Sequence, residues 1–105
     1  MLDEDSITPK IVISAKIAAK LLEKHQVSPK EVSQCFVNRN GGLLEDDRED
    51  NQTDPPTQWF IAETNQGRRL KVVFVQRQNE LGLKIYLRTA YEPNAEEIRI
   101  YGKFG

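Results

Sequence analysis

The sequence is poor in the residues that hold disulfides, metals and cofactors. It contains one cysteine and one histidine among 105 residues, which excludes an internal disulfide framework and a zinc site built from Cys and His alone. No apolar run approaches the ~20 residues that a membrane-spanning helix needs. The G-x-S-x-G, P-loop and H-E-x-x-H signatures are also missing. We therefore expect no cofactor, no metal and no membrane segment.

The length of the chain and its first residues favour a single cytoplasmic domain. A chain of 105 residues, 38% of them hydrophobic, supports one small core and not two. The acidic stretch at 1–5 is not followed by an apolar run, so it lacks the pattern of a signal peptide. We expect one domain over 1–105, with a flexible tail at 1–9 and an acidic loop at 43–56.

The net charge of −1 conceals an uneven distribution of charge. Residues 1–56 carry 11 acids and 7 bases, whereas residues 57–105 carry 5 acids and 8 bases. Such an asymmetry indicates either that the two halves neutralise each other or that the basic half attracts an anionic partner.

Sequence patterns predict a short strand and two helices in the first half. Residues 10–13 are β-branched and typical of an edge strand, which is suited to pair with a second copy of the chain. Apolar spacing predicts a helix over about 15–25. Ser-Pro-Lys-Glu at 28–31 supplies the N-cap, the first-turn proline and the capping-box glutamate of a second helix, which the glycines at 41–42 follow.

In the second half the hydrophobic period changes to two. Strands are predicted over 59–64, 69–78 and 83–91, and a last helix over about 93–103. The predicted fold class is α+β: a short edge strand, two helices, a three-stranded antiparallel meander with the helices on one side, and a C-terminal helix.

Two single residues have both a structural and a chemical interpretation. Cys35 falls on the apolar face of the second helix and is predicted to be a core residue. His25 ends the first helix, where it is suited to cap carbonyl groups, and it is also the natural acid or base of the chain.

Alternation places basic and aromatic side chains on one face of the predicted sheet. These residues are Lys71, Arg77, Lys84, Tyr86 and Arg88. Such a face is suited to bind phosphates and stack bases. RNA cleavage through the adjacent 2′-hydroxyl needs a base, an acid and cations but no metal. The alternative is that these long side chains only cover the solvent face of a half-buried sheet.

Four segments resemble the BrnT family, toxins of bacterial toxin–antitoxin pairs that have a RelE-like ribonuclease fold. They are KIVIS at 10–14, EKHQVSPKEV at 23–32, GRRLKVVFV at 67–75 and TAYEPNAEEIRIY at 89–101. The resemblance covers about nine-tenths of the chain. It implies an antitoxin partner and cleavage of messenger RNA.

The resemblance also implies site residues. Lys24 and His25 match the family's lysine–histidine pair, and Arg69 matches an arginine that opens the central strand. Glu97 and Tyr101 match residues of the last helix.

The chain departs from the family pattern at two positions. Tyr91 stands where the family keeps an active-site arginine, and Gln26 replaces a glycine. Arg88, three residues earlier, is expected on the face of Ala90 and not on that of Tyr91. The candidate catalytic residues are His25, Arg69, Lys71, Arg88 and Tyr91. The candidate substrate-binding residues are Lys24, Arg68, Arg77, Lys84, Tyr86, Glu97 and Tyr101.

The sequence also resembles short bacterial proteins labelled ADP-ribosyl-(dinitrogen reductase) hydrolase, which share the ending TAYEPNAEEIRIYGKFG. That activity would need magnesium, for which Asp46, Asp47 and Asp50 are the candidates. Such hydrolases are larger and all-helical, so we rank this function third. It follows a BrnT-like ribonuclease and a non-catalytic protein-binding module on the same fold.

Overall fold

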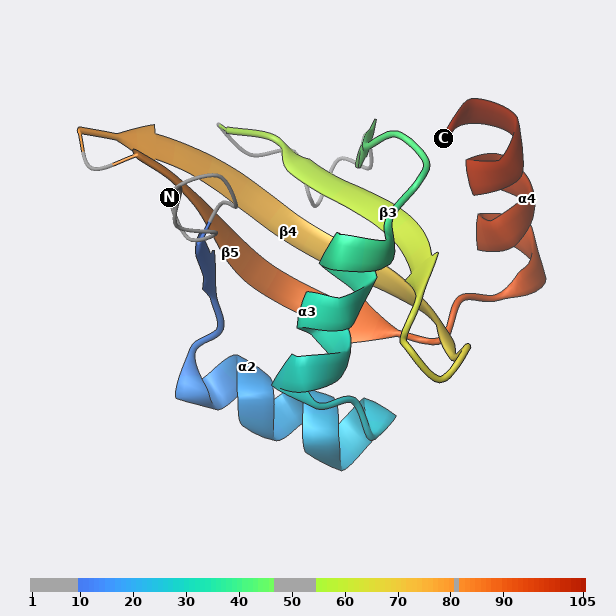
Figure 1. Cartoon of the computed structure of the whole chain (residues 1–105), viewed down its shortest axis with the longest axis horizontal. Coiled ribbons are helices and arrows are strands. Elements are labelled where there is room, and N and C mark those ends of the chain that lie inside the picture. Colours follow the sequence, from blue (N-terminus) through green and yellow to red (C-terminus); the bar gives the residue numbers. More distant parts are fainter. Residues whose placement is uncertain (1–9, 47–54, 81) are drawn as a thin grey trace, which may run out of the picture.

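The chain forms an α+β fold with three α-helices and a five-stranded mixed sheet in the part that is described (Figure 1). The structure, a computed structural model, describes residues 10–46, 55–80 and 82–105. The elements are β1 Lys10–Val12, α2 Ala15–Lys20, the π-helical turn η1 Leu21–His25, α3 Pro29–Asn38, β2 Leu44–Glu45, β3 Thr57–Glu63, β4 Arg69–Asn79, β5 Gly82–Tyr91 and α4 Ala95–Phe104. Of the helices in these ranges, none is long and apolar enough to cross a membrane.

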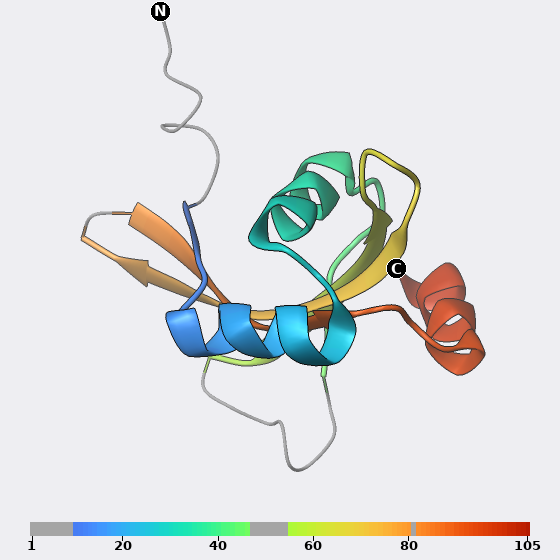
Figure 2. The ribbon, with the colours of Figure 1, turned by 90° about the horizontal axis from the view of Figure 1, so that it is seen from below.

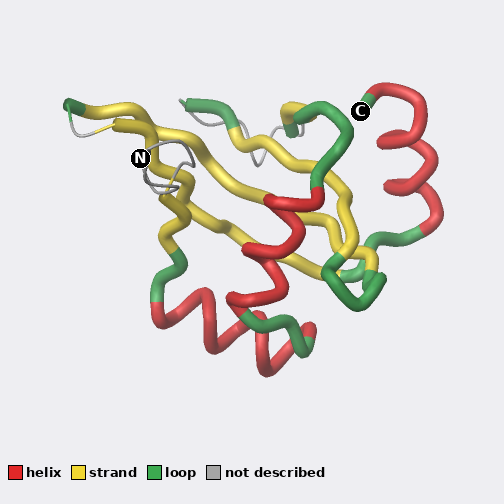
Figure 3. Tube along the Cα trace, in the orientation of Figure 1, coloured by secondary structure: helices red, strands yellow, loops and turns green. Residues whose placement is uncertain are grey.

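The sheet has the strand order β1-β5-β4-β3-β2 (Figure 3). The three long strands form the predicted meander, and β2 extends it as a fourth antiparallel strand. β1 lies at one edge, as predicted, but runs parallel to β5. The sheet is therefore mixed, and the predicted antiparallel meander forms one part of it. Helical segments stand between β1 and the meander, and a parallel neighbour is usually reached through such a crossover. Pairing of β1 with a second copy stays a prediction.

Helices α2, η1 and α3 pack with the sheet around one hydrophobic core (Figure 2). Its buried residues are Leu21, Val27, Val32, Cys35, Phe60, Ala62, Leu70, Val72, Phe74, Ile85, Leu87 and Ala90. Phe36 of α3 meets the rings of Phe60 and Phe74 edge-on, with centroids 4.9 and 5.3 Å away. The prediction that Cys35 belongs to the core is confirmed, and burial raises the pKa of its thiol to about 11.

The helix boundaries follow local chemistry. The capping box of α3 is present as predicted: Ser28 Oγ accepts from the Glu31 amide, and the Glu31 carboxylate accepts from the Ser28 amide. The helix predicted over 15–25 changes at Leu21 into the π-helical turn η1. Gln26 then ends it in the left-handed conformation, with φ of 56°.

The C-terminal helix begins two residues later than predicted, and it does not lie on the same side of the sheet as the other helices. Asn94 caps α4 and is followed by Ala95. The helix packs against Trp59 of β3 and Lys71 of β4, and the Tyr101 and Trp59 rings have centroids 5.7 Å apart. Trp59 and Lys71 alternate with the core residues of these strands, so α4 contacts the sheet face opposite the core. The expectation that all helices lie on one side is therefore wrong, because the amphipathic pattern of a helix does not indicate which sheet face receives it.

The predicted acidic loop at 43–56 contains a strand. Leu44 and Glu45 form β2 and pair with Trp59 and Gln58. Two residues are too short for a strand pattern to be recognised in the sequence. The rest of that loop, over 47–54, and the predicted flexible tail at 1–9 lie outside the described residues.

Candidate functional site

A β-bulge in β5 decides which face Tyr91 occupies. Val73 pairs with Thr89 and Phe74 with Leu87, so Arg88 is an extra residue between two regular pairs. The bulge changes the alternation of side chains along the strand. Tyr91 consequently lies directly opposite Lys71 on the same face, while Ala90 is buried in the core. The expectation that Tyr91 and Lys71 lie on different faces is wrong.

Tyr91, Lys71 and Glu97 converge from β5, β4 and α4. The Lys71 Nζ lies 2.6 Å from Glu97 Oε2, and the Tyr91 hydroxyl donates to the same oxygen at 2.8 Å. The Lys71 ammonium also stands over the Trp59 ring, 4.4 Å from its centroid. A carboxylate and the face of an indole thus hold one cation.

The ion pair between Lys71 and Glu97 is largely buried. The side chains of Lys71 and Glu97 are 6% and 17% exposed. Burial acts to raise the pKa of Glu97, but hydrogen bonds from Lys71, from the Asn94 backbone and from Tyr91 outweigh it and hold this pKa below its usual value. Glu97 is therefore a carboxylate at neutral pH.

His25, from the first half of the chain, also lies beside Tyr91. It ends η1, and its half-buried ring lies 5.5 Å from the Tyr91 ring, centroid to centroid. We call His25, Trp59, Lys71, Tyr91 and Glu97 the Tyr91 cluster. Neighbouring Lys24 is exposed. Four of the twelve predicted site residues meet in this cluster. Trp59 was not among the predicted site residues. It is the only tryptophan of the sequence and lies in a predicted strand, and this was the available signal.

Arg68 makes four hydrogen bonds with its guanidinium outside the Tyr91 cluster. Its guanidinium donates to the carbonyls of His25 and Gln26 at 2.9 and 2.8 Å. It also donates to the carboxylates of Glu31 and Glu92 at 3.1 and 2.9 Å. These bonds satisfy carbonyl groups at the end of η1 and tie it to α3 and to the end of β5.

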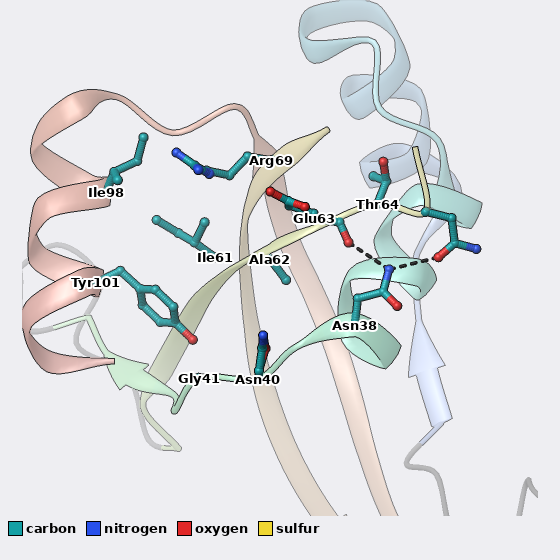
Figure 4. A pocket seen from close by; sticks show the side chains of 12 residues that line it. Asn38, Asn40, Gly41, Ile61, Ala62, Glu63, Thr64, Arg69, Ile98 and Tyr101 are labelled. Carbon is teal, nitrogen blue, oxygen red and sulfur yellow. Dashed lines mark hydrogen bonds between the residues drawn. The ribbon is translucent and has the colours of Figure 1, made fainter. Parts of the chain in front are cut away.

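Arg69 and Tyr101 are not part of the Tyr91 cluster and line a cavity of about 680 Å³ between α4 and the end of α3 (Figure 4). The Tyr101 hydroxyl donates to the Gly42 carbonyl at 2.7 Å, and burial raises the pKa of this phenol. On the opposite wall the Asn38 amide donates to the Glu63 carbonyl and to Asn65. Arg69 is exposed and has no ion pair with any residue that the structure describes.

Lys71, Arg77, Lys84 and Tyr86 share one face of the sheet, as alternation predicted, whereas Arg88 falls at the bulge. Arg77 and Lys84 face each other near the β4–β5 turn, about 20 Å from Lys71 at ~3.3 Å per residue. Along β4, Val73 and Val75 separate Lys71 from Arg77, and both valines are buried. Tyr86 pairs with Val75 at the same end, and Arg88 is exposed at the bulge. Lys71 itself is 5% exposed.

The predicted magnesium site is only partly covered by the structure. Asp46 is buried beside β2, whereas Asp47 and Asp50 lie outside the described residues. Among the residues described, no three His, Cys, Asp or Glu side chains gather in a way that would hold a metal ion.

Comparison with known proteins identifies no family for the chain. Neither a scan against protein-family models nor a search of curated proteins found a match.

Proposed function

We propose that the protein is a BrnT-like toxin of a type II toxin–antitoxin pair, with a RelE-like fold, and that it cleaves RNA in the cytoplasm without a metal ion. The observation that carries the proposal is the convergence of His25, Tyr91 and Glu97 in the Tyr91 cluster. The resemblance had named these positions from segments far apart in the chain. The order of strand, two helices, meander and helix also agrees with the fold that the resemblance implies.

The chemistry assigned to the cluster is attack by the 2′-oxygen of RNA on the adjacent phosphorus. The His25 imidazole takes the proton of the 2′-hydroxyl as the new O–P bond forms. Tyr91 gives its phenolic proton to the 5′-oxygen as that P–O bond breaks, leaving a 2′,3′-cyclic phosphate and a 5′-hydroxyl. Glu97, fixed by Lys71, orients the phenol.

Phosphate binding is assigned to exposed cations around the cluster and not to its buried lysine. Lys24 precedes His25, and Arg88 lies at the bulge, three residues before Tyr91. Arg69 begins β4, two residues before Lys71. All three are exposed, so their charges are accessible to an RNA backbone. A guanidinium such as that of Arg88 stabilises the charge of the phosphorane.

A second candidate function is a non-catalytic protein-binding module on the same scaffold. This function is favoured because two cations of the basic half are already paired with carboxylates, which leaves less positive charge for RNA. Lys71 is paired with Glu97, and Arg68 with Glu31 and Glu92. A partner protein would then replace RNA as the ligand.

Induced expression in a bacterium, with growth and total RNA followed together, separates the two functions. The toxin function predicts growth arrest with RNA cleavage. It further predicts that Arg88→Ala and Tyr91→Phe each lower the cleavage rate at least tenfold, roughly 1.4 kcal/mol. Lys103→Gln, an exposed position near the end of α4, serves as the control and should act like the unaltered protein. Normal growth with intact RNA would support the binding module.

A further inference from the structure

The cavity between α4 and the end of α3, which we call the Arg69 cavity, contains two opposite charges that do not pair with each other. Glu63 and Arg69 lie directly opposite each other in the register of β3 and β4, and both line the cavity. Both residues are exposed, and neither forms an ion pair with any residue in the described ranges. Figure 4 shows the Arg69 side chain extended toward Ile98 of α4. The cavity therefore presents one cation and one anion that are both accessible to a ligand.

The uncharged polar side chains around the cavity are mostly engaged within the fold. The Asn38 amide donates to a β3 carbonyl at 3.0 Å, and the Tyr101 hydroxyl donates to a loop carbonyl at 2.7 Å. The Thr64 hydroxyl oxygen accepts from two backbone amides at 3.1 and 3.3 Å. Asn40 also lines the cavity but carries no charge. Since hydrogen bonds to charged groups are the stronger ones, the two charges decide which ligand is selected.

The charges near the cavity do not give it a single sign. Arg68 is paired with two glutamates, and the Arg39 guanidinium donates to the Gly41 carbonyl. A simple anion would be attracted by Arg69 but repelled by Glu63, and a simple cation would meet the reverse. A ligand that carries both charges close together satisfies both side chains.

An apolar wall lies beside the two charges. It consists of Ile61, Ile98 and the ring of Tyr101, all half-buried (Figure 4). The cavity volume of about 680 Å³ is within the range of small-molecule sites, which combine apolar walls with a few polar groups. An ammonium, a carboxylate and an apolar side chain on one carbon atom define an apolar α-amino acid.

We propose that the Arg69 cavity binds a free α-amino acid with an apolar side chain. Its carboxylate accepts from the Arg69 guanidinium, its ammonium donates to the Glu63 carboxylate, and its side chain packs against Ile61 and Ile98. The proposal does not rest on RNA cleavage, because no residue of the Tyr91 cluster lines this cavity. Since phosphate binding is also assigned to Arg69, a bound amino acid would compete with RNA for its guanidinium.

Three analogues of the probe test the three parts of this recognition. The probe is L-phenylalanine, titrated into the full chain while the backbone amide signals of Ile61 and Gly102 are followed by NMR. Saturable shifts of both signals are expected. Phenylethylamine lacks the carboxylate, phenylpropanoate lacks the ammonium, and glycine lacks the side chain. Each analogue should bind at least about fivefold more weakly than phenylalanine.

Two variants assign each charge of the probe to its partner. Arg69→Gln should weaken the binding of phenylalanine at least about fivefold without weakening that of phenylethylamine, which has no carboxylate to lose a partner. Glu63→Gln should likewise weaken phenylalanine but not phenylpropanoate. Lys103→Gln and Glu80→Gln remove exposed charges at other places in the fold, and both should bind phenylalanine as the unaltered chain does.

The same spectra show whether each variant is folded. The proposal is overturned if phenylalanine causes no saturable shift in the folded chain, or if phenylethylamine and phenylpropanoate bind as tightly as phenylalanine. It is also overturned if either charge variant keeps the affinity of the unaltered chain for phenylalanine.

Discussion

At the scale of single residues, Lys71 is held where a charge is costly. Its ammonium lies between the Glu97 carboxylate and the Trp59 ring, and its side chain is 6% exposed. Lys71→Met should cost about 3 kcal/mol of unfolding free energy, because Glu97 would be left partly buried without its cation. The double variant Lys71→Met, Glu97→Gln should cost less than Lys71→Met alone, because glutamine still hydrogen-bonds to Tyr91 and Asn94 but carries no unpaired charge. Urea unfolding measures all three chains. A double variant less stable than Lys71→Met would contradict the unpaired carboxylate as the cause of the loss.

The same carboxylate gives the stability a pH dependence. The pKa of Glu97 is lower in the folded chain than its usual value of 4.5. Its contribution is therefore fully present above about pH 4.5 and is lost as the pH falls through the folded-state pKa. Thermal unfolding between pH 3 and 7 should show this loss, and Glu97→Gln should reduce it. Equal acid sensitivity in the two chains would contradict the assignment.

At the scale of elements, Arg68 joins the end of η1 to α3 and to the end of β5. A lysine cannot reproduce the fork of its bonds to two carbonyls and two carboxylates. Arg68→Lys should therefore lower the unfolding free energy by about 2 kcal/mol. Arg99→Lys is the matched control. Its partner Glu96 is a surface residue, and the change should stay within about 0.5 kcal/mol. Chemical denaturation of both variants provides the comparison, and equal losses would contradict the role given to Arg68.

The bulge at Arg88 leads to a second prediction at this scale. Removing Arg88 makes Leu87 and Thr89 neighbours opposite Phe74 and Val73, which are already their partners. The deletion should leave Tyr91 facing Lys71 and cost less than about 2 kcal/mol. Deleting Tyr86, within the regular part of the pairing, reverses the faces beyond it and should unfold the chain. Amide NMR spectra distinguish the outcomes. A collapsed spectrum for the Arg88 deletion would refute the register.

Sequence patterns predicted the elements better than their arrangement. The capping box at 28–31 and the strands of the meander depend on local signals, and both are present. The bulge was not predictable, because position 88 is an arginine and not the glycine that often marks a bulge. The face that receives α4 depends on contacts distant in sequence, such as Lys71 with Glu97.

At the scale of the whole molecule, the two faces of the sheet have different roles. One face carries the core under α2, η1 and α3, and the other carries Trp59, Lys71 and Tyr91 beside α4. Alternation predicted one face for Lys71 and the other cations, but it could not predict that α4 brings Glu97 to Lys71 and neutralises it. The resemblance named His25 and Glu97, and each of them contacts Tyr91, whereas alternation alone placed Tyr91 on the wrong face.

Cleavage of RNA by the purified chain in the presence of EDTA tests the central proposal most directly. A labelled single-stranded RNA should yield fragments with 2′,3′-cyclic phosphate ends. His25→Asn and Tyr91→Phe should each lower the rate at least tenfold, and Lys103→Gln should not. Intact RNA with a chain that circular dichroism shows to be folded, or equal rates in all four proteins, would contradict the ribonuclease function.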